Sequence, residues 1–204
     1  MKILVTGGLG FIGSHTVVSL IEHGHQVVII DDLSNSSLDV LDGIASITES
    51  KPEFHQIDVR DSQALSHFFH KQKNIEGCIH FAAYKAVGES VENPLKYYEN
   101  NTNALVYLLQ ELVNIPRCGL IFSSSCTVYG QADQLPVTED APVKKAESPY
   151  GNTKQIGEEI IHDTTKVSDL QAISLRYFNP IGAHESAKIG ELPKGTPQNL
   201  VPYI

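Results

Sequence analysis

The stretch KILVTGGLGFIG, residues 2–13, decides the fold of this chain. It begins with a short β-branched apolar run, as a buried parallel strand does, and continues through Gly7, Gly10 and Gly13 into a helical pattern. A glycine loop in this place gives a tight turn, brings the backbone close to a pyrophosphate and lets the helix pack closely on the sheet. The free N–H groups at the helix start also favour an anion. The loop predicts a dinucleotide site, with a purely structural glycine turn as the alternative.

Outward from this loop, apolar runs of strand length alternate with helical stretches. Strands are expected at residues 2–6, 26–31, 53–57, 78–83, 119–125 and 172–179. Helices are expected at residues 11–23, 35–50, from an N-cap at Asp61, 94–114 and 148–167. This alternation predicts an α/β fold with a doubly wound parallel sheet in the strand order 3-2-1-4-5-6.

The periodic pattern ends near residue 180. Residues 1–180 are expected to form one NAD-binding domain of the Rossmann type. Residues 181–204 are rich in glycine and proline and show no clear periodicity, so we expect them to begin a second, substrate-binding region. That region would be mostly missing, which makes the chain look like a fragment.

Composition limits the partners that this chain can have. A net charge of −9 argues against a nucleic-acid partner and against docking on an anionic membrane. No apolar run approaches the roughly 20 residues of a membrane span. The three cysteines form no spaced pair and the nine histidines have no fixed ligand spacing, so neither disulfides nor a metal site are expected. With no signal peptide at the N-terminus, the cytoplasm is the expected location.

Acidic residues at the strand ends predict which dinucleotide binds. Asp31 lies 18 residues after Gly13, where an acid accepts hydrogen bonds from the adenosine ribose. Asp32 follows it, and two carboxylates would repel a 2′-phosphate, so NAD is favoured over NADP. Asp32 can also be read as a solvated loop acid. Asp58 and Val59 end the third predicted strand near the expected adenine pocket, or belong to a helix N-cap region.

A tyrosine and a lysine lie one helical turn apart later in the chain. Tyr150 and Lys154 share a helix face, since residues at i and i+4 are neighbours. A nearby ammonium, together with an oxidised nicotinamide, would favour the phenolate and bring tyrosine toward acid–base chemistry at neutral pH. Ser125 ends the fifth predicted strand, where its hydroxyl could bond the reacting group. A chance pair of residues and a set of capping serines are the alternatives.

Five stretches carry a resemblance to a known family. They are TGGLGFIGSHT at 6–16, HFAAYKAVGESVENPLKYYENN at 80–101, IFSSSCTVYG at 121–130, SPYGNTK at 148–154 and LRYFNPIGAH at 175–184. The chain resembles the extended short-chain dehydrogenases/reductases of the NAD-dependent epimerase/dehydratase family. The KAVGES and RYFNPIGAH runs are most similar to its sugar-nucleotide 4-epimerases.

The resemblance implies a set of site residues. Catalysis would fall to Tyr150, Lys154 and Ser125, and substrate would contact Ser125, Tyr150, Asn179 and Asn199. The residues implied in NAD binding are Gly7, Gly10, Phe11, Ile12, Gly13, Asp31, Asp32, Leu33, Ser34, Asn35, Ser36, Asp58, Val59, Phe81, Ala82, Ala83, Tyr84, Lys85, Asn100, Tyr150, Lys154 and Phe178.

The reaction implied by the resemblance is the interconversion of UDP-glucose and UDP-galactose through transient NAD-dependent oxidation at C4. It also implies a homodimer formed by the helices at 94–114 and 149–167. Because the substrate region is mostly absent after residue 204, we expect this chain to bind NAD but to epimerise poorly. A related nucleotide-sugar dehydratase or reductase, or an NAD-binding module without catalysis, are the alternatives.

Overall fold

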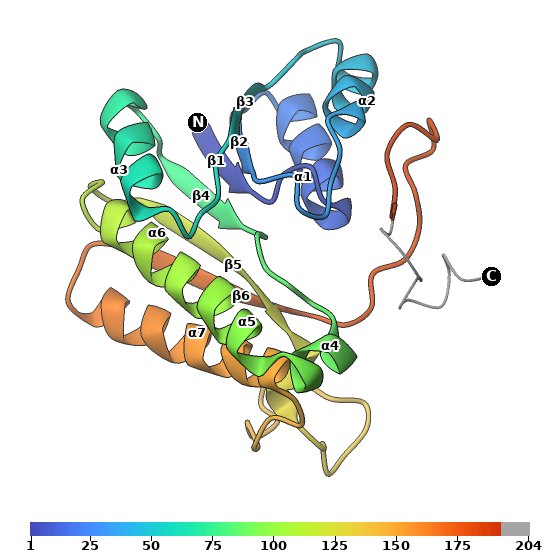
Figure 1. Ribbon diagram of the computed structural model, residues 1–204, viewed down its shortest axis with the longest axis vertical. Coiled ribbons are helices and arrows are strands. Elements are labelled where there is room, and N and C mark those ends of the chain that lie inside the picture. Colours follow the sequence, from blue (N-terminus) through green and yellow to red (C-terminus); the bar gives the residue numbers. More distant parts are fainter. Residues whose placement is uncertain (193–204) are drawn as a thin grey trace.

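A six-stranded parallel sheet forms the centre of the computed structural model, which describes residues 1–192 (Figure 1). The strand order is β3-β2-β1-β4-β5-β6, so the predicted doubly wound topology is confirmed. All five neighbouring pairs of strands run parallel. The strands are β1 (Lys2–Thr6), β2 (Gln26–Asp31), β3 (Glu53–Gln56), β4 (Gly77–His80), β5 (Gly119–Ser125) and β6 (Gln171–Tyr177).

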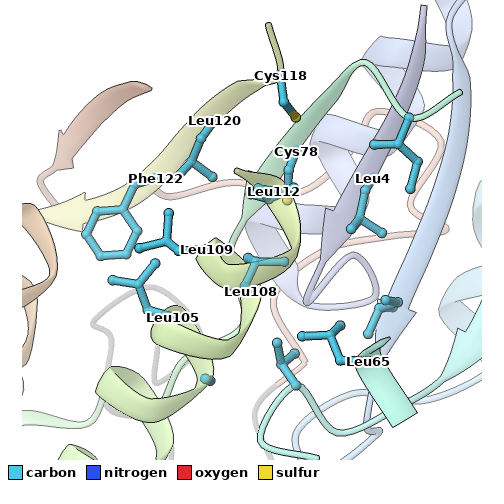
Figure 2. Packing of buried hydrophobic residues seen from close by; sticks show 14 of the residues in the cluster. Leu4, Leu65, Cys78, Leu105, Leu108, Leu109, Leu112, Cys118, Leu120 and Phe122 are labelled. Carbon is cyan, nitrogen blue, oxygen red and sulfur yellow. The ribbon is translucent and has the colours of Figure 1, made fainter. Parts of the chain in front are cut away.

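Helices cover both faces of the sheet, because its apolar residues alternate between the two sides. Ile3 and Val5 of β1 pack with α1 (Phe11–Glu22) and α2 (Asp39–Thr48) on one face. Leu4 packs on the other face, against the helices α3 (Ser62–Lys71), α6 (Ala104–Leu112) and α7 (Pro149–Lys166). Figure 2 shows the leucines of α6 pointing toward β4 and β5 on that second face.

The region between β4 and β5 differs from its prediction. Strand β4 ends at His80, opposite the end of β1 at Thr6, so residues 81–83 form a loop and not the predicted strand end. A short helix α4 (Val87–Glu92) follows, which sequence patterning missed. The predicted helix over 94–114 is divided into α5 (Pro94–Tyr98), a π-helical turn η1 (Glu99–Asn103) and α6.

The π-helical turn contains one asparagine that bonds two other segments. Asn101 is buried in η1, and its side chain donates to the backbone oxygen of Tyr84 at 3.0 Å and accepts from the Tyr84 N–H at 2.9 Å. The same amide nitrogen donates to Thr153 Oγ1 of α7 at 3.1 Å. A π-bulge turns one side chain out of the helical repeat. Here it connects the loop after β4 to α7.

Smaller differences occur at element ends. Helix α2 begins at Asp39, later than predicted, and β6 ends at Tyr177 before the predicted Asn179. Asp61 caps α3 as predicted, accepting from the backbone N–H groups of Gln63 and Ala64. A short 3-10 turn, η2 (Cys126–Tyr129), follows β5. No helix in the described part of the chain has the length and apolar composition that crossing a bilayer requires.

Residues 181–192 form neither helix nor strand and lie against the α1–α2 side of the sheet (Figure 1). Ile189 is buried there, and a Cβ on Gly43 of α2 would lie 2.7 Å from the Lys188 oxygen. The described part of this segment therefore packs on the first domain. A second region beginning at residue 181 stays a prediction, and residues 193–204 lie outside the described residues.

Candidate nucleotide pocket and catalytic cluster

Gly7, Gly10 and Gly13 of the motif after β1 differ in how much room each leaves for a Cβ. Gly7 has a φ of +67°, and a Cβ there would lie 2.7 Å from the backbone nitrogen of Ala82. A Cβ on Gly13 would lie 2.2 Å from the Gly7 oxygen, so α1 could not approach the loop with any other residue. Gly10 is different, because the nearest atom to its Cβ would be 3.3 Å away. This contact is tight but milder than those at Gly7 and Gly13, which fits a ligand passing close to the Gly10 backbone.

A pocket opens at the carboxyl ends of β1, β2, β3 and β4, where open α/β sheets bind ligands. Its lining comes from the glycine loop, the ends of β2 and β3, the loop after β4 and η1. The lining residues are Gly7, Gly10, Asp31, Asp32, Ser34, Asn35, Ser36, Ile57, Asp58, Val59, Arg60, Phe81, Ala82, Ala83, Tyr84, Asn100 and Ala104. Most belong to the predicted cofactor set, so the fold brings these distant segments together.

Some residues on or beside this pocket depart from the predicted set. Sequence reasoning missed Ile57, Arg60 and Ala104, which also line it. Eight residues were predicted for the cofactor but do not line the pocket: Phe11, Ile12, Gly13, Leu33, Lys85, Tyr150, Lys154 and Phe178. The sequence did carry a signal for Arg60, because a basic residue two positions after a strand-end acid can pair with it. A binding role for each member of the predicted set stays a prediction.

Asp31 ties the glycine loop to the loop that follows β2. Its side chain is buried, and its Oδ2 accepts the Leu9 N–H at 3.1 Å. Its Oδ1 accepts the Leu33 N–H at 3.0 Å and the Ser36 hydroxyl at 2.7 Å. Asp32 points elsewhere and accepts from the backbone and the hydroxyl of Ser34. Asp31 therefore organises the pocket and gives it negative charge.

Asp58 and Arg60 form an ion pair on the wall of the pocket. Arg60 Nη2 lies 2.6 Å from Asp58 Oδ2, and Arg60 Nε donates to both carboxylate oxygens at 3.0 Å. The Arg60 guanidinium lowers the pKa of the Asp58 carboxyl. Asp61 is the N-cap of α3, and Asp58 lies in the turn just before it, where its Oδ1 accepts the Arg60 N–H at 2.9 Å. The pair places a cation on a pocket whose other charged lining residues are acidic.

A second group of polar side chains gathers where β5 ends and α7 begins. Ser148 caps α7 by accepting the Gly151 N–H at 3.1 Å, which places Tyr150 in the first helical turn. Lys154, one turn later, is buried and donates from Nζ to the Ser123 oxygen at 2.7 Å. Its Nζ lies 5.8 Å from the centre of the Tyr150 ring. The structure thus brings the predicted tyrosine and lysine together.

Ser125 completes the candidate catalytic cluster, which consists of Ser125, Tyr150 and Lys154. It is buried at the end of β5, and its Oγ accepts from the backbone N–H and the hydroxyl of Thr127 at 3.2 and 3.0 Å. The Ser125 side chain also forms a hydrogen bond that lowers the pKa of Tyr150. Ser125 therefore has both functions that the sequence suggested as alternatives: it caps η2 and it bonds Tyr150.

Burial sets the protonation of the cluster. It raises the pKa of the Tyr150 phenol, and the Ser125 hydrogen bond offsets this only in part. Burial also lowers the pKa of Lys154 to about 8, and the Glu158 carboxylate acts in the opposite direction. The ammonium alone therefore does not bring Tyr150 into the range of a neutral-pH base, and a further positive charge is needed.

Two of the predicted substrate residues, Ser125 and Tyr150, belong to this cluster, whereas the other predicted residues on the chain after β6 are exposed or lie outside the described residues. Phe178 is 59% exposed, and Asn179 after it is exposed too. Asn199 lies outside the described residues. Lys85, predicted at the cofactor, forms an ion pair with Glu191 at 3.2 Å. Among residues 1–192 there is no group of three or more side chains suited to hold a metal ion.

Comparisons with known proteins agree with this geometry. The model of the NAD dependent epimerase/dehydratase family matches residues 3–201. Over its whole length the chain is 52% identical to the UDP-glucose 4-epimerase of Neisseria meningitidis serogroup B and 49% identical to that of Dictyostelium discoideum. It covers 60% and 59% of these two relatives. The chain thus spans about 60% of the length of the curated relatives that it matches.

Solved structures give the same result. All of this chain superposes on 61% of the UDP-glucose 4-epimerase of Bifidobacterium longum in complex with NAD+ and UDP, with a TM-score of 0.95 and 43% identity. The enzyme of Stenotrophomonas maltophila, with bound NAD and formylated UDP-arabinopyranose, matches with a TM-score of 0.94 and 46% identity over 60% of its chain. The sequence match, the sheet and the glycine loop agree, and the chain belongs to the NAD-dependent epimerase/dehydratase family.

Proposed function

We propose that this chain carries the cofactor site and the catalytic cluster of a UDP-glucose 4-epimerase, which interconverts UDP-galactose and UDP-glucose in galactose metabolism. One observation carries the proposal above the others. Ser125, Tyr150 and Lys154 meet at the carboxyl edge of the same sheet whose other strands form the nucleotide pocket. Relatives that are about half identical over this whole chain are UDP-glucose 4-epimerases.

The pocket fits NAD, judged by its own geometry. Gly10 leaves room for a pyrophosphate at the start of α1, and Asp31 and Asp32 offer carboxylates to an adenosine ribose. Asp58 and Val59 line the part of the pocket proposed for adenine. When bound, NAD would supply a reversible hydride acceptor for C4 of the sugar, so the reaction has no net redox change. NAD is proposed over NADP because the two carboxylates would repel a 2′-phosphate.

The chain's own residues would handle the proton. Tyr150 Oη is proposed to take the proton of the C4 hydroxyl as the C4 carbon is oxidised, and to return it when C4 is reduced on the other face. Ser125 is proposed to hold the C4 oxygen through its hydroxyl, which without substrate bonds the phenol. Lys154 would stabilise the phenolate by its charge. Asn179 and Asn199 are proposed to contact the substrate.

A dehydratase is a weaker candidate, because its chemistry needs an acid beside the strand-five hydroxyl. Cys126 and Thr127 follow Ser125 here, and Thr127 is bonded to the Ser125 hydroxyl. An NAD-binding module without catalysis is favoured by one fact. The chain spans only about 60% of its relatives' length, so the rest of a sugar site could lie elsewhere.

The test measures two properties separately. Calorimetry on the 204-residue chain should detect NAD binding. The complete gene product, incubated with UDP-galactose and with its N-acetyl form, should show inversion at C4 by NMR with the first substrate. Binding of NAD without inversion of either sugar would leave the module without catalysis. No NAD binding at all would defeat both functions.

Assembly and location are also proposed. We infer a homodimer through the helical stretches at 94–114 and 149–167, supported by apolar side chains at their surface such as Leu95, which is 81% exposed. A monomer in sedimentation at working concentration would count against it. A cytoplasmic location is supported by three free cysteines, two of them buried, and cell fractionation would test it.

A further inference from the structure

One face of α7 meets three consecutive residues of β5. Tyr150, Lys154 and Glu158 are spaced at i, i+4 and i+8, so they lie in a row along the helix. Tyr150 bonds the Ser125 side chain, and Lys154 donates to the Ser123 oxygen at 2.7 Å. Glu158 accepts from the Ser124 hydroxyl at 2.5 Å. The two catalytic positions of the helix therefore share a row with a carboxylate that the proposed reaction does not use.

Glu158 is held from a third element as well. Arg176 of β6 donates from Nε to Glu158 Oε1 at 3.0 Å and from Nη2 to Oε2 at 2.7 Å. Arg176 is the direct partner of Ser124 in the β5–β6 ladder. The guanidinium and the Ser124 hydroxyl can therefore reach the same Glu158 carboxylate. Its guanidinium also lies 4.8 Å from the centre of the Tyr129 ring. Both oxygens of Glu158 are thus fixed by strands on which α7 rests.

This arrangement is more than ordinary packing. The side chains of Glu158 and Arg176 are 17% and 24% exposed, and an ion pair that is largely removed from water contributes little net stability. The neighbouring residue Gly157 already allows close contact between α7 and β5. A Cβ on Gly157 would lie 2.8 Å from the Phe122 ring, which leaves no slack between helix and strand. Stability and packing therefore do not explain the presence of the Glu158–Arg176 ion pair.

We propose that Glu158, held by Ser124 and Arg176, is a positioning residue for the Tyr150–Lys154 pair, locking α7 against β5 and supplying the counter-charge of the buried lysine. This inference rests on the proposed function for its catalytic meaning. Its structural part, an effect of Glu158 on the charge of Lys154, holds whether or not the chain acts on a sugar.

The surroundings of Lys154 explain why a counter-charge is needed. His80 of β4 faces it and stays neutral, because burial lowers the pKa of that imidazole to about 3. Tyr150 on its own helix and the Ser123 oxygen of β5 are uncharged partners. Beyond Glu158 lies the cation Arg176, with Tyr129 of η2 beside it, and Cys126 of η2 faces Tyr150. Glu158 is the one carboxylate among these groups.

This makes the signs of two substitutions opposite. Glu158→Gln removes the negative charge and leaves Arg176 unneutralised, so the pKa of Lys154 should fall below its value of about 8. Arg176→Met removes the positive charge and leaves Glu158 unneutralised, so the pKa of Lys154 should rise. The double variant removes both charges and should fall between the two. Loss of packing alone would not give opposite signs.

The experiment follows the ¹³Cε signal of Lys154 during a pH titration of labelled protein, assigned by its disappearance in Lys154→Arg. Glu158→Gln should shift the Lys154 midpoint down by about one pH unit, and Arg176→Met should shift it up. Glu159→Gln is the matched control, because Glu159 is the next residue on the exposed side of α7. It should leave the midpoint unchanged.

Activity of the complete gene product gives the second readout. In Glu158→Gln the alkaline limb of kcat should move to lower pH, with about a fivefold loss at pH 8 that largely recovers at pH 6.5 and a KM changed less than twofold. Equal or same-sign shifts in the two single variants would overturn the inference. If Glu158→Gln does not fold, the upward shift in Arg176→Met decides alone. If no sugar is inverted, the proposed function fails while the titration still judges Glu158.

Discussion

The two halves of the sheet prepare their sites by different means. Around β1, β2 and β3 the pocket is shaped by backbone, with two glycines that tolerate no Cβ and a buried Asp31 whose oxygens hold loops together. Around β5, β6 and α7 the site is made of buried side chains, and burial moves the pKa of Lys154 down and that of Tyr150 up. Perturbed protonation of this kind is typical of catalytic positions.

This difference predicts which kind of substitution, a change of volume or a change of charge, each half of the sheet tolerates. The glycine loop would bind a phosphate through backbone N–H groups that do not titrate, so this part of the pocket should be indifferent to pH but sensitive to added side-chain volume. A cluster of buried ionisable groups should be tolerant of small volume changes but sensitive to charge. Variants placed in one half should therefore leave the property of the other half nearly intact.

The largest effect is expected at the phenol of Tyr150. Tyr150→Phe removes the proposed proton carrier, and loss of general acid–base catalysis should lower kcat by about 10²- to 10⁴-fold. NAD affinity should change by less than about threefold, because the nucleotide pocket lies in the other half of the sheet. Steady-state kinetics of the complete gene product and calorimetry with NAD measure the two.

Tyr107→Phe on α6 serves as the matched control for the same chemical change. It should leave kcat within twofold of the starting protein. Should Tyr150→Phe abolish NAD binding and spare the residual rate, the division of labour between the two halves would be wrong.

The next effect tests whether the glycine loop tolerates added side-chain volume. Gly13→Ala places a methyl group where the Gly7 oxygen lies 2.2 Å away, and forced shifts of that size cost about 1–3 kcal/mol. We expect that loss in the free energy of unfolding, from urea denaturation of the 204-residue chain, together with weaker NAD binding.

Gly88→Ala is the control, because no atom lies within 4 Å of a Cβ there and the residue is helical. It should be neutral or stabilise by up to about 1 kcal/mol. Equal destabilisation by the two substitutions would mean that the glycine loop is not tightly packed.

The sequence predicts these two halves unequally, for physical reasons. The glycine loop and Asp31 lie close together in the chain and carry a strand-to-helix pattern, so local reading places them well. Arg60 and Ala104 reach the pocket only through the fold, and a buried Asn101 that breaks a helix has no local signal. Lys154 is named by spacing, but its burial, and so its lowered pKa, depends on strands from elsewhere.

A smaller effect concerns the choice of dinucleotide. Asp31 and Asp32 both line the pocket, and their negative charges would repel a 2′-phosphate. The repulsion is modest, because the effective dielectric constant near a protein surface is high. NADP should bind about 10- to 100-fold more weakly than NAD by calorimetry. Asp32→Ser should narrow that difference by several-fold, because it removes one of the two carboxylates that would repel the 2′-phosphate while the Ser36 and backbone contacts of Asp31 remain.

Adding salt offers an internal check on this electrostatic origin. The gap between NAD and NADP should shrink at about 0.5 M salt, because screening weakens partly exposed charges. A gap that ignores both salt and Asp32→Ser would point to shape and not charge as the cause of the preference.

The smallest effect falls on the residue that joins the two halves. His80 bonds Thr6 Oγ1 of β1 at 2.7 Å and stacks on Phe122 of β5 with ring centres 6.1 Å apart. Burial lowers its pKa to about 3, whereas an unfolded histidine titrates near pH 6.5. Between these values the unfolded chain binds a proton that the folded chain refuses, so stability should fall as the pH falls from about 6.5, by at most about 1.4 kcal/mol per pH unit.

His80→Gln should remove this slope from the free energy of unfolding, measured in urea at pH 7, 6 and 5, whatever its effect at pH 7. His67→Gln on the exposed side of α3 should keep the slope of the starting protein. Identical slopes in the starting protein and His80→Gln would place the acid sensitivity in other groups. Loss of the slope would instead show that His80, where the two halves of the sheet meet, stays neutral in the folded chain and so adds no positive charge beside Lys154.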